Sequence, residues 1–240
     1  MTLLPLIKKL GYGVLNNTNF ARIDDLGDPE QILPLVTLID EGLTRLYSRV
    51  MLRERHVIVE MQVGVTFYHF SKLYTVQNGD PIRVPYPYIM DLPNDPFDED
   101  LVKVLRVYDP TGKERPLDDE NQPNSLFMVQ HDVMHNPYPR EGEVILVAYQ
   151  AKHKPLMVFD SVNGTVEFED EIILPPVLEP ALDNYVAYMV HMRIGTAESL
   201  AKAQGYLAVY NQICEDVEKN DLVNSSRSIT NARFDENGWI

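Results

Sequence analysis

The residues best suited to chemistry in this chain are two histidines and an aspartate in the segment QHDVMH. His131 and His135 are four positions apart and share a face in either a helix or a strand, and Asp132 lies between them. Imidazole and carboxylate groups are ligands that Zn²⁺ accepts. However, no third ligand with a familiar metal-site spacing lies nearby, and Asn136-Pro137 marks a turn directly after them. We therefore expect surface residues of a turn here.

A second candidate is the acidic run Asp118-Asp119-Glu120, which has the side chains that hold Mg²⁺ or act in acid–base catalysis. The run follows Arg115-Pro116 and has no matched partner, so a hairpin loop is the favoured interpretation. The sequence therefore predicts no catalytic residue, no metal and no cofactor, and the chain is not expected to be an enzyme. A metal-dependent hydrolase built on these two clusters is the less favoured alternative.

Composition narrows the classes of protein further. The chain has 240 residues, of which 45% are hydrophobic and 24% charged, as in ordinary globular proteins. Its formal net charge of −15 disfavours tight binding to DNA or RNA, because nucleic-acid binders carry a basic face. The single cysteine, Cys214, excludes an internal disulfide and favours synthesis in a reducing cytosol. No stretch approaches the roughly 18 continuous apolar residues of a membrane span, and MTLLPLIKKLGYG lacks the order of a secretion signal.

Two parts of the sequence carry the 3/4 spacing of amphipathic helices, one near each end. The first follows a capping signal, Asp28 with Pro29 at the first helical position, although Pro34 offers a later start of the regular helix as an alternative. The second part is divided by Gly195 and Thr196 into two helices. The predicted bundle core consists of Leu35, Ile39, Leu43 and Leu46 from the first part and Leu182, Tyr185, Met189, Leu200, Leu207, Tyr210 and Cys214 from the second. The two parts must pack together to cover these stripes.

Between the helical parts, the hydrophobic period changes to that of β-strands. Strand-like runs such as HVIVEMQVGVTFYHF, VKVLRVYD and EVILVAYQA alternate with turn signals at Asn78-Gly79, Thr111-Gly112 and Asn163-Gly164. The prolines between Asp80 and Asp100 exclude a central strand and predict a long ordered surface loop.

The sequence thus predicts an α+β protein with four parts. Residues 1–56 and 176–220 form an antiparallel helical bundle, and residues 57–175 form an inserted antiparallel β domain. Residues 221–240, DLVNSSRSITNARFDENGWI, have no periodicity and are expected to form an extended arm.

Five stretches have a familiar order along the chain. They are ILPLVTLIDEGLTRLYSRVMLRER, DEDLVKVLRVYDPTGKERPL, ILVAYQAKHKPL, EIILPPVLEPALDNYVAYMVHMRIG and the final NGWI. Together they resemble the head-to-tail adaptor (connector) proteins of short-tailed bacteriophages, over nearly the full chain. The resemblance implies a virion structural protein of which roughly twelve copies close into a ring under the portal protein.

The resemblance also implies partners. The helical part would surround the DNA channel, and the β domain would contact the tail tube or nozzle protein, with tail fibres as a further option. DNA would pass through without tight binding, which suits the acidic chain because attractive phosphate contacts would retard it. The protein would be made in the host cytoplasm and reside in the neck or tail of the virion, with no membrane and no cofactor. Another neck or tail-tube component and a soluble acidic oligomer of unknown role remain as alternatives.

Family adaptors dock on the portal partly through terminal extensions, so the resemblance implies a portal-binding arm. Its residues would be Arg227, Arg233, Phe234, Trp239 and Ile240. Burying a tryptophan contributes about 4–6 kcal/mol, whereas ordering the backbone costs about 1–2 kcal/mol per residue. A single arm would therefore be marginal, and linked copies around a ring would make the joint stable. Alternatively, Trp239 folds back onto its own bundle.

Overall fold

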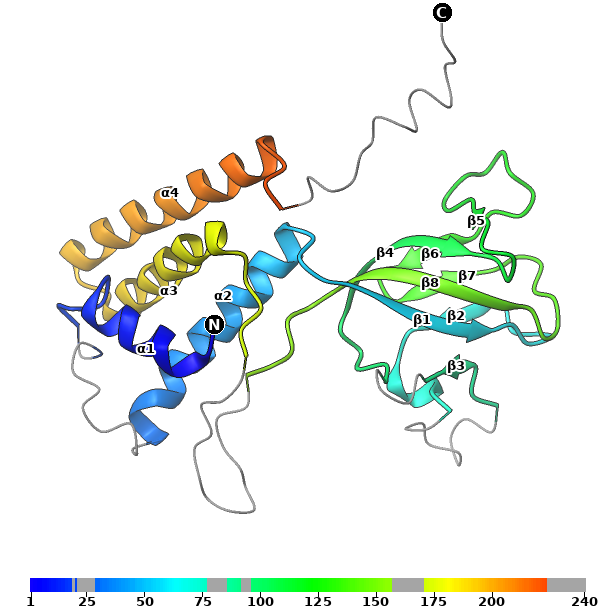
Figure 1. The fold of residues 1–240 in the computed structure, drawn as a ribbon, viewed down its shortest axis with the longest axis horizontal. Helices are drawn as coiled ribbons and strands as arrows, with labels where there is room; N and C mark the ends of the chain where they lie inside the picture. The colour runs from blue at the N-terminus through cyan, green and yellow to red at the C-terminus, as the bar shows by residue number, and fades with distance from the viewer. Residues whose placement is uncertain (19, 21–28, 77–85, 92–95, 157–170, 224–240) are drawn as a thin grey trace, which may run out of the picture. The chain divides into compact units, whose positions relative to one another are not determined.

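The computed structural model describes residues 1–18, 20, 29–76, 86–91, 96–156 and 171–223. Within these residues it contains four α-helices and eight β-strands, and the named strands all pair in the antiparallel sense. The predicted α+β class is therefore confirmed. The chain divides into two compact units: a helical unit of Met1–Met51 with Pro155–Ile240, and a β unit of Leu52–Lys154 (Figure 1).

The helical unit contains α1 (Leu3–Tyr12), α2 (Pro29–Arg49), the short 3₁₀ helix η2 (Pro176–Leu178), α3 (Glu179–Ile194) and α4 (Ala197–Lys219). Local signals determine several helix ends. Gly195 ends α3 with a φ of +72°, in the left-handed region that favours glycine, and the Thr196 side chain accepts a hydrogen bond from the Ser199 N–H at the start of α4. α2 begins at Pro29, the earlier of the two starts that the sequence left open, and Pro34 lies inside the helix. The predicted cap, Asp28, lies outside the described residues.

α3 is the helix that contacts all the others. It packs along α4 and against α2. Its contact with α1 includes an ion pair, in which Asp183 Oδ2 of α3 lies 2.8 Å from Lys9 Nζ. Gly42 of α2 permits the approach of α3, because a Cβ at this position would lie 2.8 Å from Leu182 Cδ1. Hydrophobic residues occur on every side of α3, as expected for a helix surrounded by others.

The predicted bundle core is only partly buried. The fully or almost fully buried members are Leu35, Ile39, Leu43, Leu46, Leu182, Tyr185, Tyr210 and Cys214. Met189 and Leu207 are half-buried, and the prediction is wrong for Leu200, which is 37% exposed. α4 packs through Ala203, Tyr210, Cys214 and Val217, and Leu200 lies at the edge of that contact side.

The β unit contains β1 (Glu54–Glu60), β2 (Phe67–His69), the 3₁₀ helix η1 (Lys72–Tyr74), β3 (Ile89–Met90), β4 (Leu101–Tyr108), β5 (Glu114–Arg115), β6 (Phe127–Gln130), β7 (Val133–His135) and β8 (Val144–Ala151). These strands form two sheets, a five-stranded sheet of order β3-β1-β8-β4-β5 and a three-stranded sheet of order β2-β7-β6. One hydrophobic core joins them, with Val57, Val59, Val147 and Tyr149 from the larger sheet and Tyr68 and Met134 from the smaller. Alternate side chains of the strands therefore point into this core, as the period of two predicts.

Both boundaries between the units come earlier in the chain than predicted. The β unit spans Leu52–Lys154, whereas residues 57–175 were predicted. Glu54 already pairs with Gln150, so the β unit begins before residue 57. After the β unit, the Ile172 N–H donates to the Met1 carbonyl at 2.7 Å, so this residue pairs within the helical unit. A pairing between segments so far apart in sequence leaves no local signal.

The turn and loop predictions have mixed outcomes. Thr111-Gly112 connects β4 to β5 as predicted, with Gly112 at a φ of +82°. The turns predicted at Asn78-Gly79 and Asn163-Gly164 lie outside the described residues. Within the proline-rich segment the described part includes β3, which is an edge strand, in agreement with the exclusion of a central strand. The prediction of a surface loop is wrong for Tyr88, Ile89 and Phe97, which are buried in the core of the β unit.

Candidate functional site

The structure separates the histidines proposed as metal ligands. His131 and Asp132 form the turn between β6 and β7, where the His131 side chain is 73% exposed and its Nδ1 lies 3.5 Å from Asp132 Oδ1. His135 lies on β7 and stacks on Phe67 with ring centroids 4.6 Å apart. Among the residues that the structure describes, no group of three or more His, Cys, Asp or Glu side chains could hold a metal ion.

The acidic run at 118–120 lies in the loop between β5 and β6 and shapes that loop. Asp118 adopts a φ of +57°, and its Oδ1 accepts a hydrogen bond from the Met128 N–H of β6 at 2.8 Å. Asp119 Oδ1 accepts from the Asn121 N–H at 3.0 Å. The Asp118 carboxylate thereby occupies a backbone donor of the edge strand β6, which opposes pairing with another chain there.

The residues of the predicted portal-binding arm, Arg227, Arg233, Phe234, Trp239 and Ile240, all lie outside the described residues. α4 ends at Lys219, and the turn that follows carries the chain to Val223.

A cluster of polar and aromatic side chains connects α2, from the N-terminal part of the chain, to α4, from the C-terminal part. Arg49 of α2 donates from Nε to Glu218 Oε1 at 2.6 Å and from Nη1 to Asn211 Oδ1 at 3.1 Å. The hydrogen bond with Glu218 raises the pKa of Arg49. Beside it, burial raises the pKa of Tyr210 to about 12 and also raises the pKa of Cys214. Cys214 is therefore a buried thiol held in its protonated form, as expected of a core residue.

His191 is a buried titratable group near the end of α3. It is 5% exposed, stacks on Tyr206 of α4 at 5.4 Å, and its Nδ1 has no hydrogen-bond partner among the described residues. Burial, and then the positive charge of Lys202, lower the pKa of His191. The folded state therefore holds this imidazole neutral at pH values where the unfolded chain takes up a proton.

We expect His191 to make the helical unit less stable in acid. Because its folded pKa is below the unfolded value of about 6.5, the unfolded state binds more protons, and stability falls as the pH drops through that value. Replacing His191 by phenylalanine, which keeps a ring against Tyr206, should reduce the loss of unfolding free energy between pH 8 and pH 5.5. Urea unfolding of both proteins at each pH measures this, and identical pH dependences would contradict it.

A buried ion pair holds the ends of three strands in the β unit. Arg55 of β1, 5% exposed, donates from Nη1 to Asp100 Oδ2 at 2.7 Å, and Asp100 is 8% exposed. The hydroxyl of Tyr149 on β8 donates to Asp100 Oδ1 at 2.9 Å. This cluster was not predicted from the sequence, although a signal exists: in ERHVIVE, Arg55 is in phase with Val57 and Val59 and so faces inward.

The outer face of the five-stranded sheet carries a hydrophobic row that runs across four strands. Met90, Ile58, Leu146 and Tyr108 follow one another in register from β3 to β4. Beside them, Val144 is 39% exposed, and a hollow of about 520 Å³ lies over Ile58, Tyr108, Val144 and Leu146.

The three-stranded sheet carries a second row on its own outer face. Phe67, His135 and Phe127 are register neighbours on β2, β7 and β6, and Phe67 is 48% exposed. Most members of both rows are half-buried, and only Met90 and Phe67 are exposed. Partly exposed hydrophobic rows of this kind are found on surfaces that contact other proteins.

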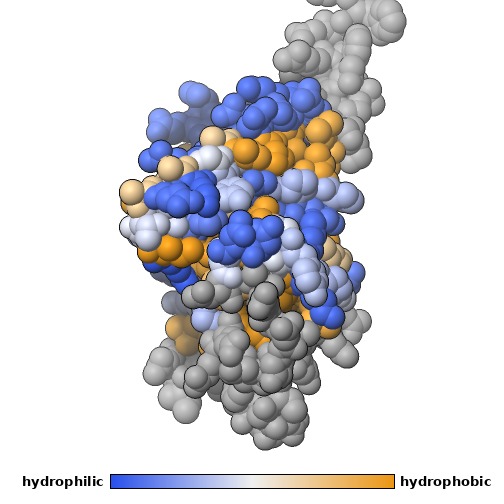
Figure 2. All heavy atoms as spheres, turned by 90° about the vertical axis from the view of Figure 1, so that its left-hand side faces the viewer, coloured by the Kyte–Doolittle hydropathy of each residue, from blue (hydrophilic) through white to orange (hydrophobic). Residues whose placement is uncertain are grey.

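The helical unit also exposes hydrophobic side chains near the turn between α3 and α4. Met192, Ile194 and Leu200 are 43%, 47% and 37% exposed. Figure 2, a view onto this unit, shows hydrophobic side chains (orange) reaching the surface among hydrophilic ones (blue). Clustered exposed hydrophobic side chains of this kind are typical of surfaces that contact other proteins.

None of the described helices combines the length and hydropathy needed to cross a membrane. A scan of the sequence against models of known protein families finds no match, and a search of curated proteins finds no significant relative.

Proposed function

We propose that this chain is a structural protein of a short-tailed phage virion, a head-to-tail adaptor. In this proposal roughly twelve copies form a ring under the portal, in the neck of the virion, and join the capsid to the tail tube or nozzle protein. The helical units surround part of the DNA channel, and the β units face tail components. Catalysis, metal and cofactor have no part in the proposal.

The observation that carries the proposal is the division of the chain. A helical unit draws on both ends of the sequence, and a β unit is inserted between them, which is the organisation that the resemblance to phage adaptors implies. The ion pairs Lys9–Asp183 and Arg49–Glu218 tie N-terminal helices to C-terminal ones, which suits a bundle built from both ends. The antiparallel bundle as a whole and the extended arm belong to the proposal.

The partly exposed hydrophobic rows of the β unit support a role in assembly, because a ring subunit that also carries a tail must contact several proteins at once. The net charge of −15 suits a channel through which DNA passes, since an acidic wall repels phosphate and does not hold it. A solved ring with a predominantly basic channel would contradict this part of the proposal.

The test mixes the purified chain with its candidate portal ring and measures the mass of the complex by analytical ultracentrifugation. We expect the full-length chain to add roughly twelve copies and a chain truncated after Leu222 to bind far more weakly, because truncation removes Phe234 and Trp239. Far-UV circular dichroism of both chains controls for folding.

The outcomes separate the two parts of the proposal. If both chains add equally, the helical unit does the docking and the arm is not the anchor. If neither chain adds to the portal, the adaptor proposal fails.

A further inference from the structure

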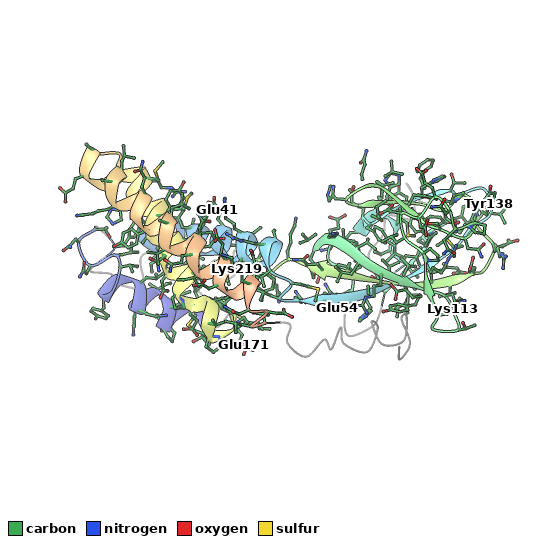
Figure 3. The ribbon with its side chains drawn as sticks, turned by 90° about the horizontal axis from the view of Figure 1, so that it is seen from above. Glu41, Glu54, Lys113, Tyr138, Glu171 and Lys219 are labelled. Carbon is green, nitrogen blue, oxygen red and sulfur yellow. The ribbon has the colours of Figure 1, made fainter. Side chains whose placement is uncertain are left out.

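The outer side of α4 lacks charge over the middle of the helix. Between Lys202 and Glu215 the sequence AQGYLAVYNQIC contains no charged residue, in a chain with 24% charged residues. The exposed residues along this side are Ala201, Gln204, Gly205, Ala208, Val209 and Gln212, and Val209 is 43% exposed. α4 lies along the outside of the helical unit, with Lys219 near its end (Figures 1 and 3).

Gly205 is unexplained by the contacts of the described residues of its own unit. Glycine in the middle of a helix is less favourable than alanine, and among the described residues a Cβ at Gly205 would have no heavy atom within 4 Å. Gly42 offers the contrast, because there the missing Cβ makes room for Leu182. A reason for Gly205 outside the subunit is the close approach of another backbone.

The charges at the two ends of this side have a definite order. Glu198 and Lys202 pair at 2.7 Å near the start of α4, and Glu215 and Lys219 pair at 3.2 Å near its end. Spacings of three and four residues place all of them on the side that carries Gly205 and Gln212.

This order is self-complementary. Suppose that a second copy of α4 packs antiparallel on the first, with a two-fold axis between Ala208 and Val209. Glu198 then faces Lys219 of the second copy. Lys202 then faces Glu215 of the second copy, about the same point. A parallel arrangement in the same register would set like charges against each other.

We propose that two copies of this chain pair through the outer sides of their α4 helices, antiparallel, with Gly205 near the closest approach of the two backbones. The pairing goes beyond the proposed adaptor function and does not rest on it. A closed ring joins its copies through two different surfaces, whereas this contact uses one surface twice. The pair is therefore a form of the subunit outside the ring, in which the α4 side is covered.

The first test is the oligomeric state of the full chain by sedimentation equilibrium over a range of concentrations. We expect a monomer–dimer equilibrium for the natural chain and a dissociation constant at least ten-fold higher for Gly205→Leu. The leucine enters open space and favours the helix, so circular dichroism and urea unfolding should show an intact fold. A natural chain that stays monomeric throughout, or a Gly205→Leu chain that dimerises unchanged, overturns the proposal.

The second test uses charge exchange. Lys202→Glu and Glu215→Lys should each weaken self-pairing, because each sets like charges against one another at both ends of the pair. An equimolar mixture of the two variants should regain the dimer as a heterodimer, since every facing pair is then opposite in charge.

Lys113→Glu, which makes the same charge change at an exposed position of the β unit, is the matched control and should leave the dimer unaffected. Failure of the mixture to pair more tightly than either variant alone overturns the antiparallel arrangement.

Discussion

Replacing Asp100 by alanine should lower the free energy of unfolding of the β unit by about 3–5 kcal/mol, because it removes the nearest counter-charge of a buried guanidinium. Arg55 is 5% exposed and donates to Asp100 at 2.7 Å, and Tyr149 donates to the other carboxylate oxygen at 2.9 Å. The alanine variant removes both acceptors while the positive charge stays in place. Neither group regains its hydration without opening the ends of β1, β4 and β8.

Urea unfolding followed by far-UV circular dichroism and tyrosine fluorescence measures this loss. Asp98→Ala is the matched control, because Asp98 also lies near Arg55, at 3.8 Å, but its side chain is 54% exposed. Removing such a partner should cost no more than about 1 kcal/mol. Equal losses for the two variants would show that Asp100 is not the partner that holds Arg55.

Leu182→Ala should destabilise the helical unit by about 2–5 kcal/mol, the usual range for emptying a buried leucine site. Leu182 is fully buried on α3 and lies against the position of Gly42 on α2. The loss has two sources, the transfer of the side chain from the interior and the cavity that remains. The close approach of α2 leaves little freedom for the helices to fill that cavity.

Leu200→Ala is the matched comparison, with the same chemical change at a position that the sequence also placed in the core. Because Leu200 is 37% exposed, we expect a change within about 0.5 kcal/mol, as for ordinary surface substitutions. Thermal and urea unfolding at low protein concentration measure both variants. A loss at Leu200 as large as that at Leu182 would mean that α4 packs through a different side.

The amphipathic period of α2 predicted its buried residues well, and on α3 Leu182 and Tyr185 are buried as predicted, because both helices have neighbours over a wide angle. Leu35, Leu43 and Leu182 are all fully buried. α4 differs, since other helices cover only one of its sides. Its hydrophobic residues are spread over more of the circumference than that side can hold, and spacing alone does not show that the side is centred on Ala203 and Tyr210.

Functional residues were also hard to predict from residue type and spacing alone. The types of His131 and His135 suggested chemistry, yet one lies in an exposed turn and the other stacks on Phe67. The ionic cluster that the structure does contain joins Arg55 to Asp100, which are 45 residues apart. A spacing of that length carries no periodic signal, so only the inward phase of Arg55 in its strand pointed to a buried charge.

By itself the sequence determined the α+β class, the end of α3 at Gly195, the start of α4 after Thr196, and the turn at Thr111-Gly112. These features depend on backbone preferences and side-chain periods within a few residues. Only the tertiary structure decided that Leu200 is exposed, that Arg55 meets Asp100, and that hydrophobic rows cross the outer faces of both sheets. Those facts depend on which distant segments become neighbours, and the burial of a side chain is a property of its neighbours as much as of its own type.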